Sequence, residues 1–305
     1  MLKYSLAAIV LAASFATPAA AQETLDLRTL VAAFVKPTNA ERAQVVLDQL
    51  VAAGFEPVME PFEGGNRQTG AMEGLNIVVT FGGGEGREVE PEILLTAHYD
   101  AVKLRDGTLS HGVVDNAASV VGVIEAARIL REKPLKHRVR LILFDQEELG
   151  LLGARKWIEA HGLANVVAVV NSDVVAYGDT MMYGQNNGAQ SAFVTRAVQA
   201  VCAERALQCV GYPEYPPSDD RAFSAAGAPV VSLGFQDQVG AHQMWLAFNG
   251  GQATGLAEGF VPQVFRLIHS NEDTMEHVDP ATVALAGATY AAVVERLDAQ
   301  LAGVD

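Results

Sequence analysis

The sequence predicts an α/β fold: a mostly parallel central sheet with helices on both faces, forming a three-layer sandwich. Hydrophobic strand runs such as "RVRLILFD" at 138–145 alternate with helical stretches such as "AASVVGVIEAARILRE" at 117–132. Strands that alternate with helices in this way build parallel sheets whose two faces are covered. With 305 residues, 50% of them hydrophobic, the chain has ample material for one large core or two small ones.

The N-terminal part contains two helical stretches followed by two strands. Helices are expected at roughly 26–35 and 40–53, and strands at 55–62 and 74–81. The glycines of "GGGEG" at 82–86 indicate a hairpin-type turn after the second strand.

From residue 92 onward, strands and helices alternate. Gly162 ends one helix, Ser191 caps another, and Asp279 with Pro280 begins the last. Residues 236–260 form the one long irregular segment, and irregular segments of this length are uncommon unless they are functional. The expected strands are 92–98, 138–145, 166–173 and 228–235, and the expected helices are 117–132, 151–162, 191–207 and 279–302.

The first 21 residues have the features of a secretory signal peptide. Lys3 is followed by an apolar run, and Pro18 and three alanines precede the expected cleavage after Ala21. The run is too short for a spanning helix, and no later segment is long, apolar and uncharged. The mature chain is therefore expected in a periplasm or outside the cell, the alternative being a retained N-terminal anchor. No repeat or linker divides residues 22–305, which are expected to form a single domain.

The charge balance is acidic, with 36 Asp and Glu against 21 Lys and Arg and a formal net charge of −15. Nucleic acids and anionic membrane surfaces are therefore not expected as partners. Acidity of this kind carries no information about the fold.

The two cysteines are Cys202 and Cys209. In an oxidising compartment we expect them to form a disulfide. Within one helix their Cα atoms would lie about 10 Å apart, which is too far, so a disulfide requires the helix to end between them, near Ala206. The alternative is a pair of buried free thiols. A cysteine metal site is not indicated, because no CxxC or Cys/His zinc spacing occurs.

Acidic and imidazole residues stand where three of the expected strands end. His98 and Asp100 lie in "HYD", Glu147 and Glu148 in "DQEE", and Asp173 in "NSD". Ligands of open parallel sheets bind beyond the carboxyl ends of the strands. We therefore expect these side chains to share one edge of the sheet.

Two further candidates lie in loops, Asp115 in "HGVVDNAAS" and His269 in "IHSNEDT". Taken singly, such residues have ordinary explanations: a DN pair before a helix is most often an N-cap, and paired acidic residues usually lie on the surface. Several carboxylates gathered at one edge are costly to bury unless they are paired or coordinated. Oxygen and imidazole ligands without a thiolate favour zinc, ahead of manganese or cobalt.

In their order, the segments "TAHYD", "GVVDNAAS", "LFDQEELGLLGARKW", "NSD", "SDDRAF", "AGAPVVSL" and "IHSNEDT" resemble the di-zinc aminopeptidases of metallopeptidase family 28. The resemblance runs from about Leu75 to Asp279. It implies the zinc-dependent exopeptidase fold and a single metallopeptidase catalytic domain over 22–305. It further implies two Zn²⁺ per chain bridged by Asp115, with Glu148 and His269 completing one site and His98 and Asp173 the other.

The same resemblance implies two catalytic roles. Glu147 matches the general base that takes a proton from the water held by the two metals, and Asp100 matches the carboxylate that orients His98. Neighbouring residues of a regular strand point to opposite faces. The backbone is therefore expected to turn at 146–148, so that Glu147 and Glu148 reach one site.

The expected activity is that of an exported aminopeptidase that removes an apolar N-terminal residue from peptides. The apolar side chains of "GAHQMWLAF" are expected to line the substrate pocket, the alternative being a helix that packs them into the core. Tyr215 matches a substrate-contacting tyrosine of another branch of the family, the alternative being a tyrosine of a proline-rich loop. The expected substrate-binding residues are Tyr215, Met244, Trp245 and Phe248.

The sequence also departs from the family pattern. Asp220 stands where many relatives have histidine after Ser-Asp, and Ile268 where some have a tyrosine that assists the oxyanion.

Three other functions are alternatives to an aminopeptidase. A glutaminyl cyclase shares the fold but uses one zinc, whereas the full ligand set favours two. A non-catalytic peptide-binding protein would have lost the metals. A carboxypeptidase-like dipeptidase would need a cation for the substrate carboxylate, for which Arg221 is the local candidate.

Overall fold

The computed structural model describes residues 26–83, 91–250 and 260–303. The expected signal peptide, 1–21, lies outside these residues, as do residues 84–86 of the expected hairpin turn. Within the described part of the chain, no helix combines the length and hydrophobicity needed to cross a membrane.

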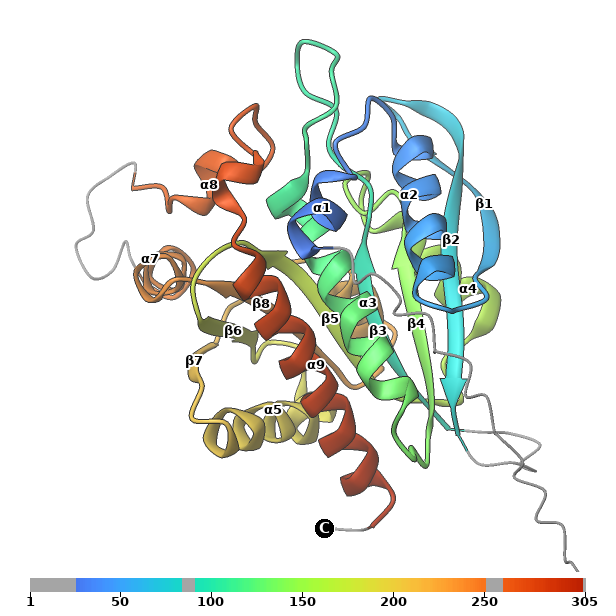
Figure 1. Cartoon of the computed structure of the whole chain (residues 1–305), viewed down its shortest axis with the longest axis vertical. Coiled ribbons are helices and arrows are strands. Elements are labelled where there is room, and N and C mark those ends of the chain that lie inside the picture. The colour runs from blue at the N-terminus through green and yellow to red at the C-terminus, as the bar shows by residue number, and fades with distance from the viewer. Residues whose placement is uncertain (1–25, 84–90, 251–259, 304–305) are drawn as a thin grey trace, which may run out of the picture.

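A single eight-stranded sheet organises the chain, with helices on both faces as the sequence predicts (Figure 1). Its order is β1-β2-β4-β3-β5-β8-β6-β7. The pairs β4-β3, β3-β5, β5-β8 and β6-β7 are parallel, and the pairs β1-β2, β2-β4 and β8-β6 are antiparallel. The strands are β1 (Val58–Asn66), β2 (Gly70–Gly82), β3 (Glu92–His98), β4 (Arg138–Phe144), β5 (Val166–Val175), β6 (Thr180–Gly184), β7 (Gln208–Tyr212) and β8 (Val230–Gln236).

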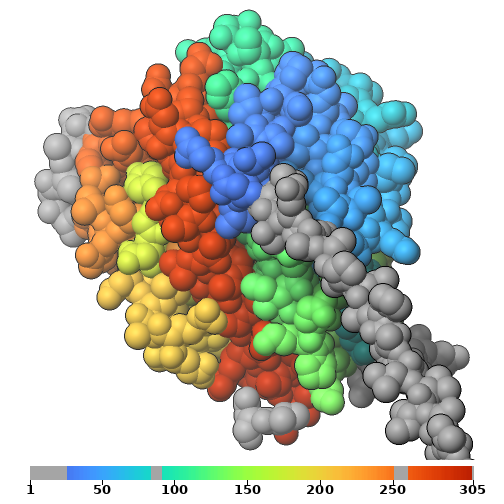
Figure 2. All heavy atoms as spheres, viewed as in Figure 1, coloured from blue at the N-terminus to red at the C-terminus, as the bar shows by residue number. Residues whose placement is uncertain are grey.

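Among the described helices, four pack against one face of the sheet and a fifth packs outside them, and together they enclose the larger hydrophobic cluster. Figure 2 shows the C-terminal helix running between α3 and α5 across this face. Two helices cover the other face, where Trp157 and Phe223 pack in a smaller cluster. The first set comprises α1 (Leu27–Ala32), α2 (Asn39–Ala52), α3 (Ala118–Arg131), α5 (Ala192–Glu204) and α9 (Pro280–Leu301), and the second comprises α4 (Leu152–His161) and α6 (Asp220–Ala225).

Several local predictions need correction. The stretch predicted as irregular contains helix α7 (Gln238–Phe248) and, further on, the chain forms the short helix α8 (Val264–Leu267). Strands β6 and β7 were not expected, and the helix predicted to reach residue 207 ends at Glu204. The turn predicted at 82–86 cannot join a hairpin, because β4 lies between β2 and β3. The hairpin of this region is β1-β2, which turns at residues 67–69.

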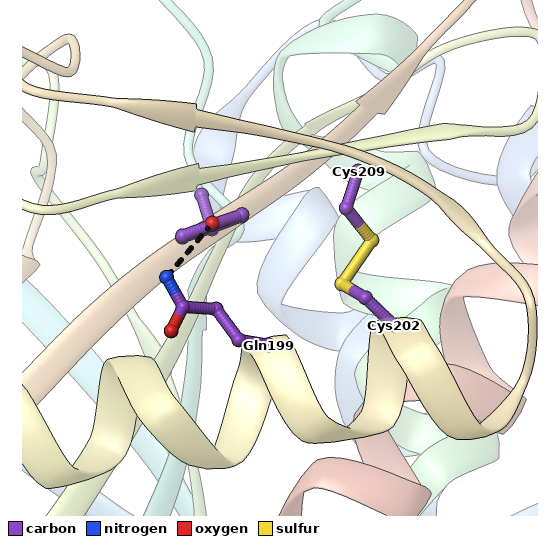
Figure 3. The surroundings of a disulfide bond; sticks show 4 residues. Gln199, Cys202 and Cys209 are labelled. Atoms are coloured by element: carbon purple, nitrogen blue, oxygen red, sulfur yellow. Dashed lines mark hydrogen bonds between the residues drawn. A yellow bond between two sulfur atoms is a disulfide. The ribbon is translucent and has the colours of Figure 1, made fainter.

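A disulfide joins Cys202, in the last turn of α5, to Cys209 in the edge strand β7 (Figure 3). The helix ends between the two cysteines, and Ala206 adopts a left-handed conformation with φ 50° as the chain reverses. The adjoining Gln199 donates a hydrogen bond to the Tyr183 hydroxyl of β6. The end of α5 is thus tied to the outer strands of the sheet.

We expect replacement of both Cys202 and Cys209 by serine to lower the free energy of unfolding by about 2–3 kcal/mol, because a short loop is no longer closed in the unfolded chain. Urea unfolding of the oxidised wild-type and double-variant proteins measures the loss. Thiol titration of denatured, unreduced protein is the control, and two free thiols there would contradict the disulfide.

Candidate metal centre

The carboxyl ends of three adjacent parallel strands deliver most of the candidate ligands. His98 is the last residue of β3, Asp173 lies near the end of β5, and Glu147 and Glu148 follow β4. The register pairs His98 with Phe144 at the end of β4, so these ends meet at one edge. Ligands of parallel sheets bind at this edge.

The chain turns sharply after β4 at Gln146, which has a φ of 57°. This left-handed conformation is uncommon for a non-glycine residue, and two side chains fix it. The Gln146 side chain accepts a hydrogen bond from Gly65 N and donates one to Glu73 O of the β1-β2 hairpin. Asp145 accepts from the Gln146 and Leu75 amides. The turn directs Glu147 and Glu148 into the same cavity.

A second irregularity lies in β5, beside Asp173. Val174 has a φ of 62°, and the pairing of β5 with β8 shifts between Ser172 and Val175. A β-branched residue in this conformation is strained. Asn116 bonds to both sides of the irregularity, donating to Ser172 O and accepting from Val174 N. The segment next to Asp115 therefore fixes the backbone around Asp173.

Asp115 lies between the two imidazoles. Its Oδ1 is 3.2 Å from His98 Nε2, and its Oδ2 is 3.1 Å from His269 Nε2. His269 Nε2 is also 3.1 Å from Glu148 Oε2, and His98 Nε2 is 3.7 Å from Asp173 Oδ1. The potential ligand atoms form two groups, and within each group they lie within 4.8 Å of one another. One group comprises His98, Glu147 and Asp173, and the other comprises Asp115, Glu148 and His269. Asp115 has one oxygen toward each group, the arrangement that a bridging carboxylate requires.

Asp100 is buried beneath this cluster and contacts three of its members. Its Oδ1 lies 3.3 Å from His98 Nδ1. Its two oxygens also accept hydrogen bonds from the Glu147 and Glu148 amides, at 3.1 and 3.2 Å. Asp100 can therefore orient His98 and fix the turn that carries both glutamates.

Asp273 binds the backbone that carries Asp115. Its carboxylate accepts hydrogen bonds from the amides of Val113, Val114 and Asp115, at 3.0, 2.7 and 3.2 Å. These amides belong to η1 (Val113–Ala117), the single turn that precedes α3. Asp273 was not among the predicted site residues, although it stands in the same "IHSNEDT" motif as His269.

The charges of the cluster favour a cation. Asp115 and then Glu148 raise the pKa of His269 to about 11. Burial, followed by the charge of Asp115, raises the pKa of Glu148 to about 7. Buried carboxylates this close together require positive charge nearby.

The donor set fits zinc. It contains imidazole nitrogens and carboxylate oxygens, which zinc binds. Glu148 Oε1 and Asp173 Oδ1 are buried without a hydrogen-bond partner, and such groups are costly unless they are coordinated or paired. His98, Asp115, Glu148, Asp173 and His269 could therefore hold two ions between them.

A cavity of about 260 Å³ opens onto the cluster. Its remaining walls are mostly apolar, and they include three of the four predicted substrate-binding residues, namely Tyr215, Met244 and Phe248. Sequence reasoning missed part of the lining, because α8 gave no periodic signal in so short a helix. The missed residues are Val174, Pro216, Pro217, Val264, Phe265 and Ile268.

The prediction that Trp245 contacts substrate needs correction. Trp245 does not line the cavity; its indole nitrogen donates a hydrogen bond to Gly211 O of β7, and its ring packs on the core. Because α7 is a helix, successive residues point in different directions. Met244 therefore faces the cavity while Trp245 faces the sheet.

The two positions at which the sequence departs from the family pattern differ in their surroundings. Asp220 is buried and accepts hydrogen bonds from Asn187 and from Ser218 N. Ile268 lines the cavity directly before His269. Arg221 is committed elsewhere, since it donates to Asn186 O and Tyr215 O.

An α/β sheet with two groups of histidine and carboxylate ligands at its carboxyl edge defines the architecture of a metallohydrolase. Residues 76–294 match the family model "Peptidase family M28". The chain belongs to this family, as the sequence motifs indicate.

Curated relatives agree with this assignment. Aminopeptidase YwaD of Bacillus subtilis is 39% identical over 70 residues, which cover 23% of this chain and 14% of that protein. The probable lipoprotein aminopeptidase LpqL of Mycobacterium tuberculosis is 28% identical over 225 residues, covering 66% of this chain and 42% of that protein. The chain thus spans less than half the length of these relatives.

Solved structures share the fold. A Zn-dependent exopeptidase from Parabacteroides distasonis superposes with a TM-score of 0.68 at 17% identity, over 88% of this chain and 96% of that one. The glutaminyl cyclase of Porphyromonas gingivalis gives a TM-score of 0.68 at 18% identity, over 89% and 97%. The zinc aminopeptidase BSAP of Bacillus subtilis gives 0.60 at 22% identity, over 74% and 50%.

Proposed function

We propose that the chain is an exported zinc aminopeptidase whose catalytic domain comprises residues 22–305. It removes the N-terminal residue of peptides and prefers an apolar first side chain. The observation that carries the proposal is the position of Asp115, with one carboxylate oxygen toward His98 and the other toward His269. Membership of peptidase family M28 and the similarity to curated aminopeptidases support it.

Each ligand residue has an assigned place. Asp115 would hold both zinc ions, with Glu148 and His269 as the further ligands of one and His98 and Asp173 as those of the other. When bound, the pair of zinc ions supplies Lewis-acid polarisation of the scissile carbonyl and positive charge for the oxygens of the reacting centre.

Glu147 is the general base. It lines the same cavity as the five ligands, and its backbone is fixed by the hydrogen bond from its amide to Asp100. Its carboxylate takes a proton from the attacking water and transfers it to the nitrogen that leaves as the C–N bond breaks. The peptide bond is thus replaced by a free carboxylate and a free amine.

Carboxylates bind the substrate's N-terminal amine. Glu148 and Asp173 both line the cavity, and each carboxylate has a second oxygen beside the one that would hold zinc. An ammonium group satisfies such oxygens well. Among the described residues, no lysine or arginine lines this cavity, and Arg221 donates to the carbonyls of Asn186 and Tyr215 instead. A dipeptidase or carboxypeptidase function is therefore disfavoured.

The apolar wall supports the side-chain preference. Met244, Phe265 and Ile268 line the cavity from α7, α8 and the segment before His269. Phe248 extends this wall, its ring centroid lying 5.8 Å from that of Phe265. An apolar first side chain would be buried among these groups.

A panel of aminoacyl-anilides tests the proposal. Each buried methylene is worth about 0.8 kcal/mol, so kcat/KM for Leu, which has three more carbons than Ala, should exceed that for Ala by tens-fold, and acetyl-Leu should not be cleaved. Met244→Ala should reduce the Leu-to-Ala ratio several-fold. Trp245→Ala is the matched control, because Trp245 is on the same helix but outside the cavity, and it should leave the ratio unchanged.

The same panel separates the alternatives. Cleavage of acetyl-Leu as fast as Leu would refute the exopeptidase proposal, and equal rates for Glu, Lys and Leu anilides would refute the apolar pocket. Ammonia release from a peptide with N-terminal Gln, without hydrolysis of the Leu anilide, would identify a glutaminyl cyclase instead. A chain that binds no zinc after incubation with the metal would indicate a non-catalytic peptide-binding protein.

A further inference from the structure

Arg42 is a buried arginine in helix α2, outside the residues that match the family model. Its Nε donates a hydrogen bond to Tyr99 O at 2.6 Å, and its Nη1 and Nη2 donate to His111 O and Gly112 O at 2.8 and 3.0 Å. A fourth hydrogen bond reaches Phe34 O at 2.9 Å. All four end on main-chain carbonyls.

These carbonyls belong to the segments that carry the candidate ligands. Tyr99 stands between His98 and Asp100, and residues 111–112 lead directly into Asp115. Arg42 holds the carbonyls of 111 and 112 while Asp273 holds the next three amides, 113 to 115. Side chains therefore fix both the carbonyls and the amides of the segment 111–115.

Gly112 is closely packed against Arg42 and the segment 111–115. Gly112 has a φ of 55°, and a Cβ placed there would lie 3.1 Å from Arg42 Nη1 and 2.8 Å from Asp115 O. A left-handed glycine in close contact with the guanidinium allows the two backbone carbonyls to face Arg42.

Nearby carboxylates stabilise the positive charge of the Arg42 guanidinium. Burial lowers the pKa of Arg42 to about 10, so it remains charged at neutral pH, and the carboxylates of Asp100 and Asp273 favour that charge. A planar guanidinium can donate in several fixed directions at once, whereas the ammonium of lysine is a single point of charge.

We infer that Arg42 is a positioning residue of the metal centre. It joins the β3 end to the segment 111–115 and places Asp115 for metal binding before any metal is present. This role rests on the proposed function, since it concerns the same two zinc ions. Helix α2 precedes the residues that match the family model, and through Arg42 it would contribute to the metal centre.

Arg42→Lys tests the inference, because it keeps the charge and removes the planar set of donors. We expect zinc affinity, measured on the full chain by competition with a chelating dye, to fall about tenfold or more, as for other residues that hold metal ligands in place. The visible absorption of the Co²⁺-substituted variant should also change, because it reports ligand geometry.

Arg131→Lys is the matched control. Arg131 lies over the ring of Phe55, as Arg42 lies over that of Phe34. It donates to the carbonyls of Ala53 and Gly54, at the other end of α2. Its replacement should lower the thermal midpoint of the metal-free chain without changing zinc affinity or the Co²⁺ spectrum. If Arg42→Lys has the same zinc affinity and the same Co²⁺ spectrum as Arg131→Lys and the wild-type chain, the role of Arg42 is wrong.

Hydrogen exchange of the wild-type chain provides a test that does not depend on the variant folding. The amides of Val113, Val114 and Asp115 should exchange slowly in the metal-free protein, because Arg42 and Asp273 already fix the segment. Exchange at the rate of an unstructured loop until zinc is added would refute the inference. A wild-type chain that binds no zinc would instead overturn the proposed function, so the two failures are distinguishable.

Discussion

Glu147→Gln should retain both zinc ions and lose about two to four orders of magnitude in kcat, the usual contribution of a positioned general base. Glutamine has nearly the same shape and keeps the backbone hydrogen bond to Asp100. Its amide cannot accept the proton of the attacking water. Metal analysis and steady-state kinetics on Leu anilide, made on the same preparation, measure both expectations.

The neighbouring change, Glu148→Gln, is the matched control for this experiment. Glu148 lies 3.1 Å from His269 Nε2 and belongs to the ligand group, so the same substitution one residue later should reduce zinc content as well as activity. Near wild-type turnover in zinc-loaded Glu147→Gln would refute the assignment of the base. Loss of zinc in that variant would reassign Glu147 as a ligand.

Asp115→Ala should abolish binding of both zinc ions at stoichiometric metal. The carboxylate has one oxygen within reach of each imidazole, so a single substitution removes a ligand from both sites. The fold should survive, because the Asp115 amide and its two predecessors remain bonded to Asp273. Zinc per chain after dialysis, with circular dichroism as the folding check, measures the result.

An aspartate of the exposed loop provides the control for that substitution. Asp106→Ala changes the same net charge at a surface position and should leave two zinc ions per chain. If Asp115→Ala also retains two, the bridging role is wrong. Retention of one ion would mean that Asp115 serves a single site.

The sequence was sufficient to predict the strand ends and the residues gathered there, for a physical reason. A parallel strand buried on both faces is a continuous apolar run, so the acidic residue that interrupts it, as Asp145 does after Phe144, marks the end of the strand. The order of such ends along the chain predicted the α/β sheet. The tight turn at Gln146 followed from the need to direct two adjacent glutamates to one site.

Other features depend on contacts between distant segments, and no local pattern encodes them. Helix α7 carries apolar side chains on more than one face, so its packing against β6, β7 and β8 decides which of them face the cavity. That is why Met244 was placed correctly at the cavity and Trp245 was not. Arg42 and Asp273 act through backbone carbonyls and amides, and the sequence does not reveal which of these groups an isolated charged residue will meet.

The open sheet has two outer strands, and each is protected from association with other chains in a different way. Unpaired strand edges invite pairing with further strands, which leads to aggregation. At one edge, the disulfide from Cys209 to α5 holds β7 in place covalently. At the other, Pro61 in β1 has no amide to donate, and the exposed Glu63 adds a charge. Protection of the β7 edge therefore depends on the disulfide, and we expect reducing conditions to promote self-association through β7 rather than β1.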